Sequence, residues 1–164
     1  MSMNTVPERL AALRAAMAAN GVAVYLIPVG DPHASEYLPA HYTSLTWFSG
    51  FHGENSNLVV TRTGSALWAD GRYFVQAEKE LAGTEIELQR MGEPGVPTVE
   101  EYCANALNEG EVLGLCGLTA SCGLVRGVQK ELDAKKGTIK TLNLEDELWT
   151  EGRPARPATP AWIR

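Results

Sequence analysis

The chain has 164 residues, of which 45% are hydrophobic and 21% are charged. This size and composition are typical of one globular domain with its own core. No apolar run approaches the ~20 residues that a membrane span requires, and residues 1–14 lack the apolar stretch of a secretory signal. The net charge is −6, and the arginine-rich last fourteen residues leave −8 on residues 1–150. Such an acidic body repels phosphate backbones, and no basic amphipathic stretch is present, so we expect no nucleic-acid or membrane partner.

The predicted elements begin with a helix. Residues 5–8 read Thr-Val-Pro-Glu, a capping box in which proline is tolerated in the first turn. Apolar residues then recur at helical spacing up to a stop at residues 20–21. Residues 22–27 form a fully apolar run with β-branched and aromatic members, which predicts a strand buried on both faces.

Two further strands are predicted at residues 58–61 and 66–69, joined by a turn at residues 62–64. A helix capped by Asp70 is expected next. Its apolar face comprises Phe74, Ala77 and Leu81. The alternating pattern of residues 85–88 then predicts a strand with one exposed face.

The remaining elements keep the same alternation. A second capping box at residues 98–101 opens a helix, residues 112–116 form an apolar strand, an amphipathic helix covers residues 124–132, and residues 139–142 form a last strand. Interleaved helices and apolar strands predict an α/β fold, a mixed sheet covered by helices. From residue 151 the chain becomes rich in proline, so we assign residues 1–150 to one domain and residues 151–164 to a linker that leaves it.

No complete active site is evident. The three histidines lack the spacing of zinc ligands, and the three cysteines form no CxxC pair. We therefore expect no catalytic residue and no metal site in this chain. An odd number of widely spaced cysteines favours a reducing, cytoplasmic setting over a disulfide framework.

Three stretches are rich in functional residue types: residues 31–37, 47–55 and 68–74. The first follows a strand end, where α/β proteins tend to place sites, but the residue types favour a turn with local side-chain-to-backbone bonds from Asp31 and Ser35. The second is interpreted as a shaped loop whose aromatic side chains plug the core. In the third, Arg72 is expected within the first turn of a helix, where the dipole disfavours a cation. This mismatch hints at a ligand or partner for Arg72, although the pattern alone favours an ion pair with Asp70 or a surface carboxylate.

Taken together and in order, these stretches resemble the aminopeptidase P family in its three-domain cytosolic form. The matching segments are 30–33, 35–37, 48–51, 68–74, 76–77, 90–92, 97–98, 143–144, Asp146, Trp149, 153–154 and 156–157. One departure concerns residues 52–57, His-Gly-Glu-Asn-Ser-Asn, where the family usually continues Asp-Gly-Ser-Ala-Gly.

The resemblance implies a creatinase-type N-terminal domain of ribonuclease-H-like topology. In the family, a similar middle domain and a catalytic domain follow, and the latter holds two divalent metal ions, usually manganese. Arg72 corresponds to the family's substrate-binding arginine, with His33 and His52 as further candidates.

The chain is accordingly expected to be a non-catalytic domain of a metallopeptidase that releases the residue preceding proline. It would help to cap the active site, bind peptides with proline at the second position and assemble a cytoplasmic homo-oligomer. Alone it would be inactive. The alternatives are a free-standing binding module with the same fold, or a domain of a related prolidase or creatinase.

Overall fold

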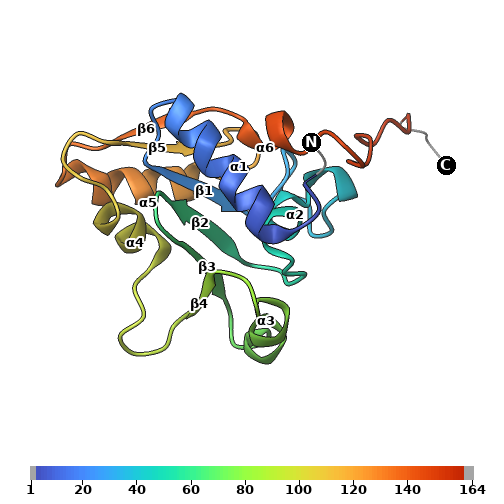
Figure 1. The fold of residues 1–164 in the computed structure, drawn as a ribbon, viewed down its shortest axis with the longest axis horizontal. Coiled ribbons are helices and arrows are strands. Elements are labelled where there is room, and N and C mark those ends of the chain that lie inside the picture. Colours follow the sequence, from blue (N-terminus) through green and yellow to red (C-terminus); the bar gives the residue numbers. More distant parts are fainter. Residues whose placement is uncertain (1–2, 161–164) are drawn as a thin grey trace.

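The computed structural model describes residues 3–160 and shows a mixed sheet with helices on both faces (Figure 1). The strands are β1 (Val24–Pro28), β2 (Asn57–Thr61), β3 (Ser65–Ala69), β4 (Ile86–Arg90), β5 (Val112–Leu115) and β6 (Thr138–Thr141). They lie in the order β4-β3-β2-β1-β5-β6. β2 is antiparallel to both neighbours and the other pairs are parallel. The predicted α/β class is therefore confirmed.

Seven helical segments surround the sheet within residues 3–160. They are α1 (Val6–Ala19), the 3-10 helix η1 (Ala40–Tyr42), α2 (Ser44–Ser49), α3 (Phe74–Glu80), α4 (Val99–Asn105), α5 (Cys122–Asp133) and α6 (Leu144–Leu148). Both predicted capping boxes are present, at Thr5 with Glu8 and at Thr98 with Glu101. The two clearest sequence signals for helix starts are thus confirmed.

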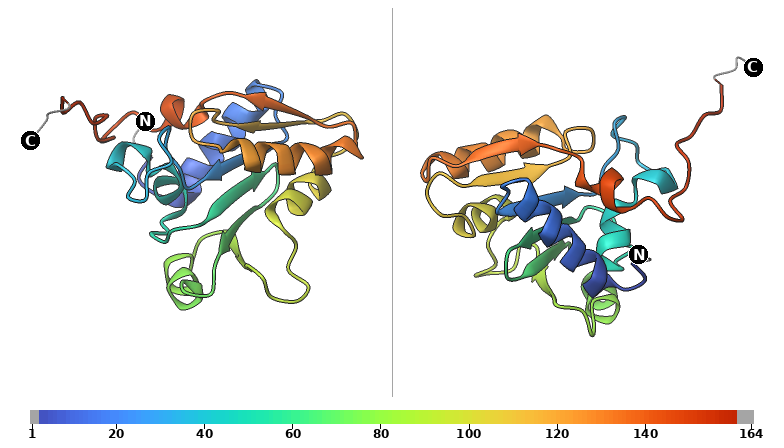
Figure 2. Two further views of the ribbon diagram at one scale, coloured as in Figure 1. Left: turned by 180° about the vertical axis from the view of Figure 1, so that it is seen from behind. Right: turned by 45° about the horizontal axis from the view of Figure 1, so that its top comes forward.

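The two faces of the sheet carry separate cores, because successive side chains of a strand point to opposite sides. In β1, Tyr25 and Ile27 pack with α1, α2 and α6. Val24 and Leu26 pack instead with α4 and α5. Figure 2 shows α4 and α5 on one face and α1 on the other. Every residue of β1 is buried, as the uninterrupted apolar run predicted.

Residues 47–55 differ from the shaped loop that was predicted. Residues 47–49 belong to α2, which ends at Gly50 in the left-handed conformation with φ of 78°. Only glycine adopts this conformation without strain, so it terminates the helix. The expected aromatic plugs are present, because Phe48 and Phe51 are fully buried.

Residues 151–160 lie outside helices and strands and extend away from one end of the molecule (Figure 1). Residues 161–164 of the expected linker lie outside the described residues. The boundary between residues 150 and 151 stays a prediction.

Candidate functional site

A groove of about 950 Å³ opens at one end of the sheet. The parallel strands β1 and β5 both end there, and carboxyl ends of parallel strands are a common place for ligand sites in α/β folds. Its walls come from the loop after β1, from residues 42–46 of η1 and the start of α2, from residues 52–57 that lead into β2, and from the loop that joins β5 to α5. Arg72 completes the lining. The groove thus brings all three predicted stretches together.

The first wall is held by Asp31. Its Oδ1 accepts hydrogen bonds from the backbone N–H groups of His33 at 2.8 Å and Ser35 at 3.0 Å. The bond from Ser35 is the main cause that lowers the pKa of the Asp31 carboxyl. The local-turn interpretation of Asp31 is therefore confirmed, and this carboxylate organises the loop.

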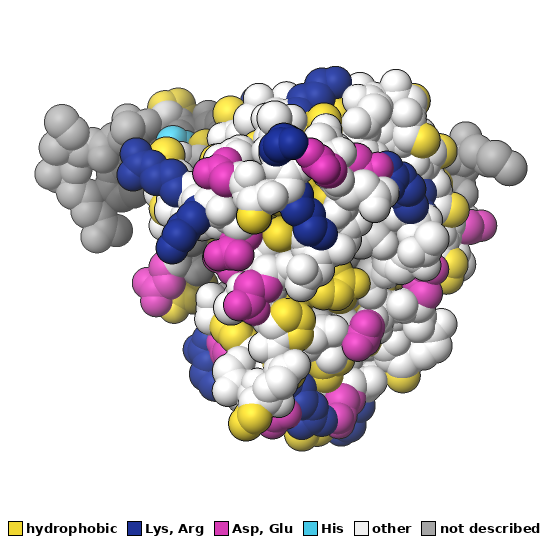
Figure 3. Space-filling view, turned by 90° about the vertical axis from the view of Figure 1, so that its left-hand side faces the viewer, with side chains coloured by type: hydrophobic (Ala, Val, Ile, Leu, Met, Phe, Trp, Pro, Cys, Tyr) yellow, Lys and Arg dark blue, Asp and Glu magenta, His cyan; other side chains and the backbone are white. Residues whose placement is uncertain are grey.

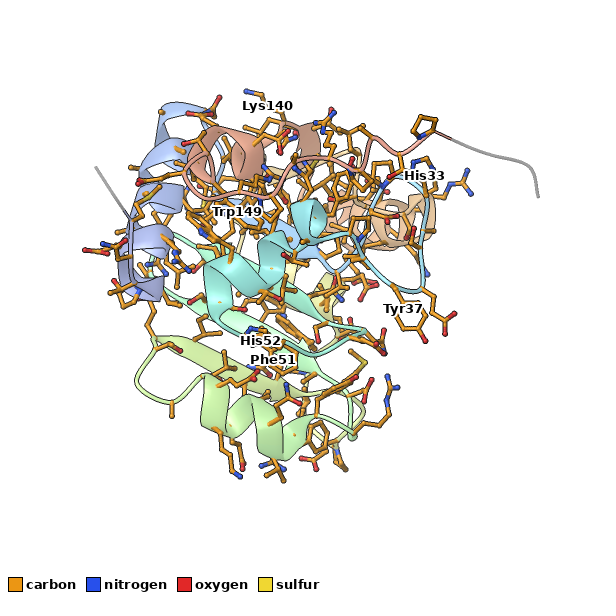
Figure 4. The ribbon with its side chains drawn as sticks, turned by 90° about the vertical axis from the view of Figure 1, so that its right-hand side faces the viewer. His33, Tyr37, Phe51, His52, Lys140 and Trp149 are labelled. Atoms are coloured by element: carbon orange, nitrogen blue, oxygen red, sulfur yellow. The ribbon has the colours of Figure 1, made fainter. Side chains whose placement is uncertain are left out.

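The loop after β1 places the side chains of His33 and Tyr37 apart from each other (Figure 4). Tyr37 lines the groove and is 80% exposed. His33 is also exposed but is not among the residues that line the groove. Of the predicted site residues, the structure brings Arg72 and His52 to the groove and leaves His33 outside it.

The second wall depends on Phe51 and Gly53. A Cβ atom at Gly53 would lie 2.2 Å from the buried Phe51 ring, so no larger residue fits without movement. The intervening His52 donates its backbone N–H to Glu80 Oε2 at 2.9 Å, and its Nδ1 lies 3.3 Å from Glu80 Oε1. The end of α3 therefore holds His52 at the groove.

Arg72 lies beside this wall with 64% of its side chain exposed. Its Nε and Nη2 donate to Asp70 Oδ1 at 3.1 Å and Oδ2 at 2.8 Å, and its backbone N–H donates to Oδ1 at 3.0 Å. Asn55 adds a bond to Asp70 Oδ2 at 3.3 Å. The Arg72 side chain is the main cause that lowers the pKa of Asp70 to about 2. The guanidinium is thus oriented by an ionised carboxylate while it stays open to solvent.

This arrangement corrects two predictions. Asp70 does not cap α3, because its side chain bonds Arg72 and its carbonyl accepts from the N–H of Tyr73 to close a turn. α3 begins only at Phe74, so Arg72 precedes the helix and its predicted place on the helix dipole was wrong.

The wall between β5 and α5 was missed. It includes Leu118, which is 52% exposed. A sequence signal existed at Gly30, where a Cβ atom would lie 2.5 Å from the carbonyl oxygen of Thr119. The glycine permits this close approach of two backbones, but the sequence does not show which loop approaches.

A second polar cluster lies away from the groove. Glu145 of α6 is 2% exposed, and its Oε2 lies 3.1 Å from the hydroxyl of Tyr25. That hydroxyl also lies 3.0 Å from the Leu142 carbonyl and accepts from the N–H of Leu144 at 3.1 Å. Burial raises the pKa of Glu145 to about 7, and burial also raises that of the neighbouring Cys116 thiol. A protonated Glu145 makes the three contacts of the Tyr25 hydroxyl compatible, because Glu145 donates to Tyr25 while Tyr25 donates to the carbonyl. The other carboxyl oxygen of Glu145, Oε1, is buried and has no hydrogen-bond partner among residues 3–160.

The described residues do not fit a metal centre. Among residues 3–160 there is no group of three or more histidine, cysteine, aspartate or glutamate side chains that could hold a metal ion. The donors near the groove are engaged in pairs, such as Asp70 with Arg72 and His52 with Glu80. In the same part of the chain, no helix has the length and apolar character of a membrane span.

Comparison with known proteins places these observations in a family. Residues 9–148 match the creatinase/prolidase N-terminal domain. The chain belongs to this family. Aminopeptidase P2 of Arabidopsis thaliana is 39% identical over 159 residues, which cover 93% of this chain and 22% of that protein. The chain spans about a quarter of the length of the curated relatives it matches.

Solved structures agree with this assignment. The X-prolyl aminopeptidase of Caenorhabditis elegans, a cytosolic enzyme with a di-nuclear active site, is 33% identical with a TM-score of 0.83. The similarity covers 93% of this chain and 26% of that one. The N-terminal domain of the cytoplasmic peptidase PepQ from Mycobacterium tuberculosis matches with a TM-score of 0.59 at 24% identity, over 85% of this chain and 95% of that chain. This last likeness concerns the fold alone.

Proposed function

We propose that this chain is the non-catalytic N-terminal domain of an Xaa-Pro aminopeptidase, in which its groove forms part of the mouth of the active site. The observation that carries the proposal is the position of Arg72. Its guanidinium is held by Asp70 at Nε and Nη2, and Nη1 makes no hydrogen bond to another group in residues 3–160. An arginine oriented in this way can bond a peptide carbonyl or carboxylate.

The groove suits a peptide. It combines exposed apolar side chains, Tyr37 and Leu118, with the donors of Arg72 and His52. Peptide sites need this mixture of apolar walls and a few oriented polar groups. His52 lines the groove and is a second candidate for contact with the substrate. His33 lies outside the groove, so it would contact only a substrate that extends beyond it.

The chemistry of hydrolysis is assigned to the rest of the longer enzyme. The donor set of residues 3–160 fits no pair of divalent ions, so the metal ions, manganese by the resemblance, would be held there. The domain contributes contacts to peptides with proline at the second position and to the other domains of the enzyme. A cytoplasmic homo-oligomer is part of the same proposal.

The test compares residues 1–164 with the longer chain that carries them. Each is incubated with an Xaa-Pro peptide and added manganese, and release of the first residue is measured. The proposal predicts release by the longer chain alone. Turnover that follows the 164-residue chain through purification would overturn it.

A titration tests the alternative of a free-standing binding module. In this proposal the catalytic part of the site belongs to the rest of the enzyme, so the isolated domain should bind the same peptide only at millimolar concentration or above. Saturation at micromolar peptide would favour the binding module. A micromolar Kd corresponds to a binding free energy of about −8 kcal/mol.

A further inference from the structure

The chain leaves the domain under restraint from one buried arginine. Arg153 lies in the proline-rich segment, yet only 9% of its side chain is exposed. Its Nε and Nη2 both donate to the backbone carbonyl of His41, at 3.1 Å and 3.0 Å, and its Nη1 pairs with Asp146 of α6. The guanidinium therefore joins the departing chain to η1 and to α6 at once.

An aromatic stack supports this arginine. The guanidinium lies 5.0 Å from the ring centroid of Trp149, and Trp149 stacks on Trp47 with centroids 5.6 Å apart and an interplanar angle of 16°. Arg9 of α1 in turn lies 4.5 Å from the Trp47 ring and donates to the Trp47 carbonyl at 2.6 Å. Contacts between cations and rings are stronger when they are shielded from water. The exit of the chain is thus connected to α1.

The ring of His41 holds the next residues. Its Nδ1 lies 2.8 Å from the carbonyl oxygen of Pro154, and its Nε2 lies 3.3 Å from Nε of Arg156. A carbonyl only accepts and a guanidinium only donates, so the two contacts require a neutral imidazole with its proton on Nδ1. Arg156 also reaches Asp146 at 3.3 Å. Both arginines of the Arg-Pro-Ala-Arg-Pro segment therefore share one carboxylate.

Two prolines restrict the backbone of the departing segment. Pro154 and Pro157 come directly after the two anchored arginines. Proline fixes its own φ and disfavours the helical conformation in the preceding residue. A segment restrained at two such points leaves the domain as a stiff, extended chain.

We propose that Arg153, His41 and Asp146 form a clasp that fixes the direction in which the chain leaves the domain, and so sets the orientation of the departing segment relative to the groove. The clasp and the groove share one element, since Tyr42 and Thr43 come directly after His41 and line the groove. Figure 2 shows the departing chain beside α6 and η1. The proposal concerns orientation and does not depend on peptide binding at Arg72.

Backbone ¹⁵N relaxation of the 164-residue chain tests the clasp at the amides of Ala155, Ala158 and Thr159. In the wild type, Ala155 should have an order parameter of about 0.8, and Arg153→Gln should lower it below about 0.6. Arg153→Lys should fail to restore order, because an ammonium cannot reproduce the planar fork of donors. Arg62→Gln is the matched control, since it removes an arginine bonded to Glu111 elsewhere, and should leave these amides unchanged.

Low order in the wild type, or unchanged order in Arg153→Gln, would overturn the clasp. An equal loss of order in Arg62→Gln would overturn it as well. If Arg153→Gln does not fold, His41→Ala provides a second route. It keeps the backbone carbonyl that Arg153 bonds and removes only the ring that holds Pro154 and Arg156. The amides of Ala158 and Thr159 should then lose order, and order retained there would count against the proposal.

Discussion

Two arginines from the sequence motifs of this chain differ in their exposure to solvent. Both guanidinium groups pair with a carboxylate and lie over an aromatic ring, Tyr73 for Arg72 at 5.2 Å and Trp149 for Arg153 at 5.0 Å from the ring centroid. They differ in that Arg72 is 64% exposed, whereas Arg153 is 9% exposed and also bonds a backbone carbonyl. An exposed ion pair contributes ~0–1 kcal/mol to stability, while an arginine buried among several partners is costly to remove. One arginine therefore lines the groove, and the other joins the departing chain to η1 and α6.

Two carboxyl groups show the same contrast. Asp70 beside Arg72 has its pKa lowered to about 2, and Glu145 of α6 has its pKa raised to about 7 by burial. The carboxylate at the groove is stabilised in its ionised form by an arginine, whereas burial favours the protonated form of Glu145. On the face shown in Figure 3, acidic and basic side chains are interspersed.

The largest expected effect concerns Glu145. The carboxyl group of Glu145 has its ordinary pKa of 4.5 in the unfolded chain, whereas its pKa in the folded chain is about 7. The free energy of unfolding should therefore fall as pH rises through this window. Glu145→Gln removes this dependence, so its stability relative to wild type should change by roughly 2–3 kcal/mol between pH 5 and 8. Urea unfolding at several pH values measures the difference.

Glu147→Gln is the control on the same helix. Glu147 is exposed, so this variant should keep the pH dependence of the wild type. A Glu145→Gln curve parallel to that of wild type would contradict the contrast between the two carboxyl groups.

The next effect in size concerns the hydroxyl of Tyr25. Tyr25→Phe leaves the N–H of Leu144 and the carboxyl of Glu145 without this partner in a buried site. Loss of a buried partner costs about 1–3 kcal/mol, which chemical denaturation detects. Tyr102→Phe is the control, because the Tyr102 ring packs edge-on against Trp68 and its hydroxyl makes no hydrogen bond within residues 3–160, so the variant should change stability little. Equal losses in the two variants would mean that the cluster does not stabilise α6.

The smallest effect is expected at Asp70. Asp70→Asn breaks an ion pair whose arginine is mostly exposed, so the free energy of unfolding should fall by no more than about 1 kcal/mol. Thermal unfolding at neutral pH is the measurement, with Glu54→Gln as a control on the same groove wall. A loss above 2 kcal/mol would show that the Asp70–Arg72 pair is structural.

The fold was predicted from the sequence where local signals are strong. The two capping boxes, the apolar run of β1 and the turn at residues 62–64 all correspond to observed elements. The short helices α2 and α6 were not predicted. Helices of this length are unstable alone, and here the stacking of Trp47 on Trp149 joins them, a contact that no local pattern indicates.

The sequence indicated two side chains that line the groove, but neither the wall between β5 and α5 nor the full geometry; the substrate role of these residues stays a prediction. Arg72 and His52 line the groove, but the side chain of His33 does not, because the turn around Asp31 sets the path of its loop. The direction of a loop side chain depends on contacts such as the approach of Gly30 to Thr119. Those contacts join segments far apart in sequence, so spacing alone does not indicate them.

The most direct test of a substrate-binding role for the groove measures two quantities on one variant, Arg72→Ala, in the longer enzyme. Charge-assisted bonds from an arginine to a peptide contribute ~1.5–3 kcal/mol, so kcat/KM should fall roughly ten- to a hundredfold. The melting temperature should stay within about 2 °C, because the pair with Asp70 is exposed. Arg72→Lys should rescue little if binding uses the guanidinium fork. A lowered melting temperature with near-normal kcat/KM would contradict this role and make Arg72 a structural partner of Asp70.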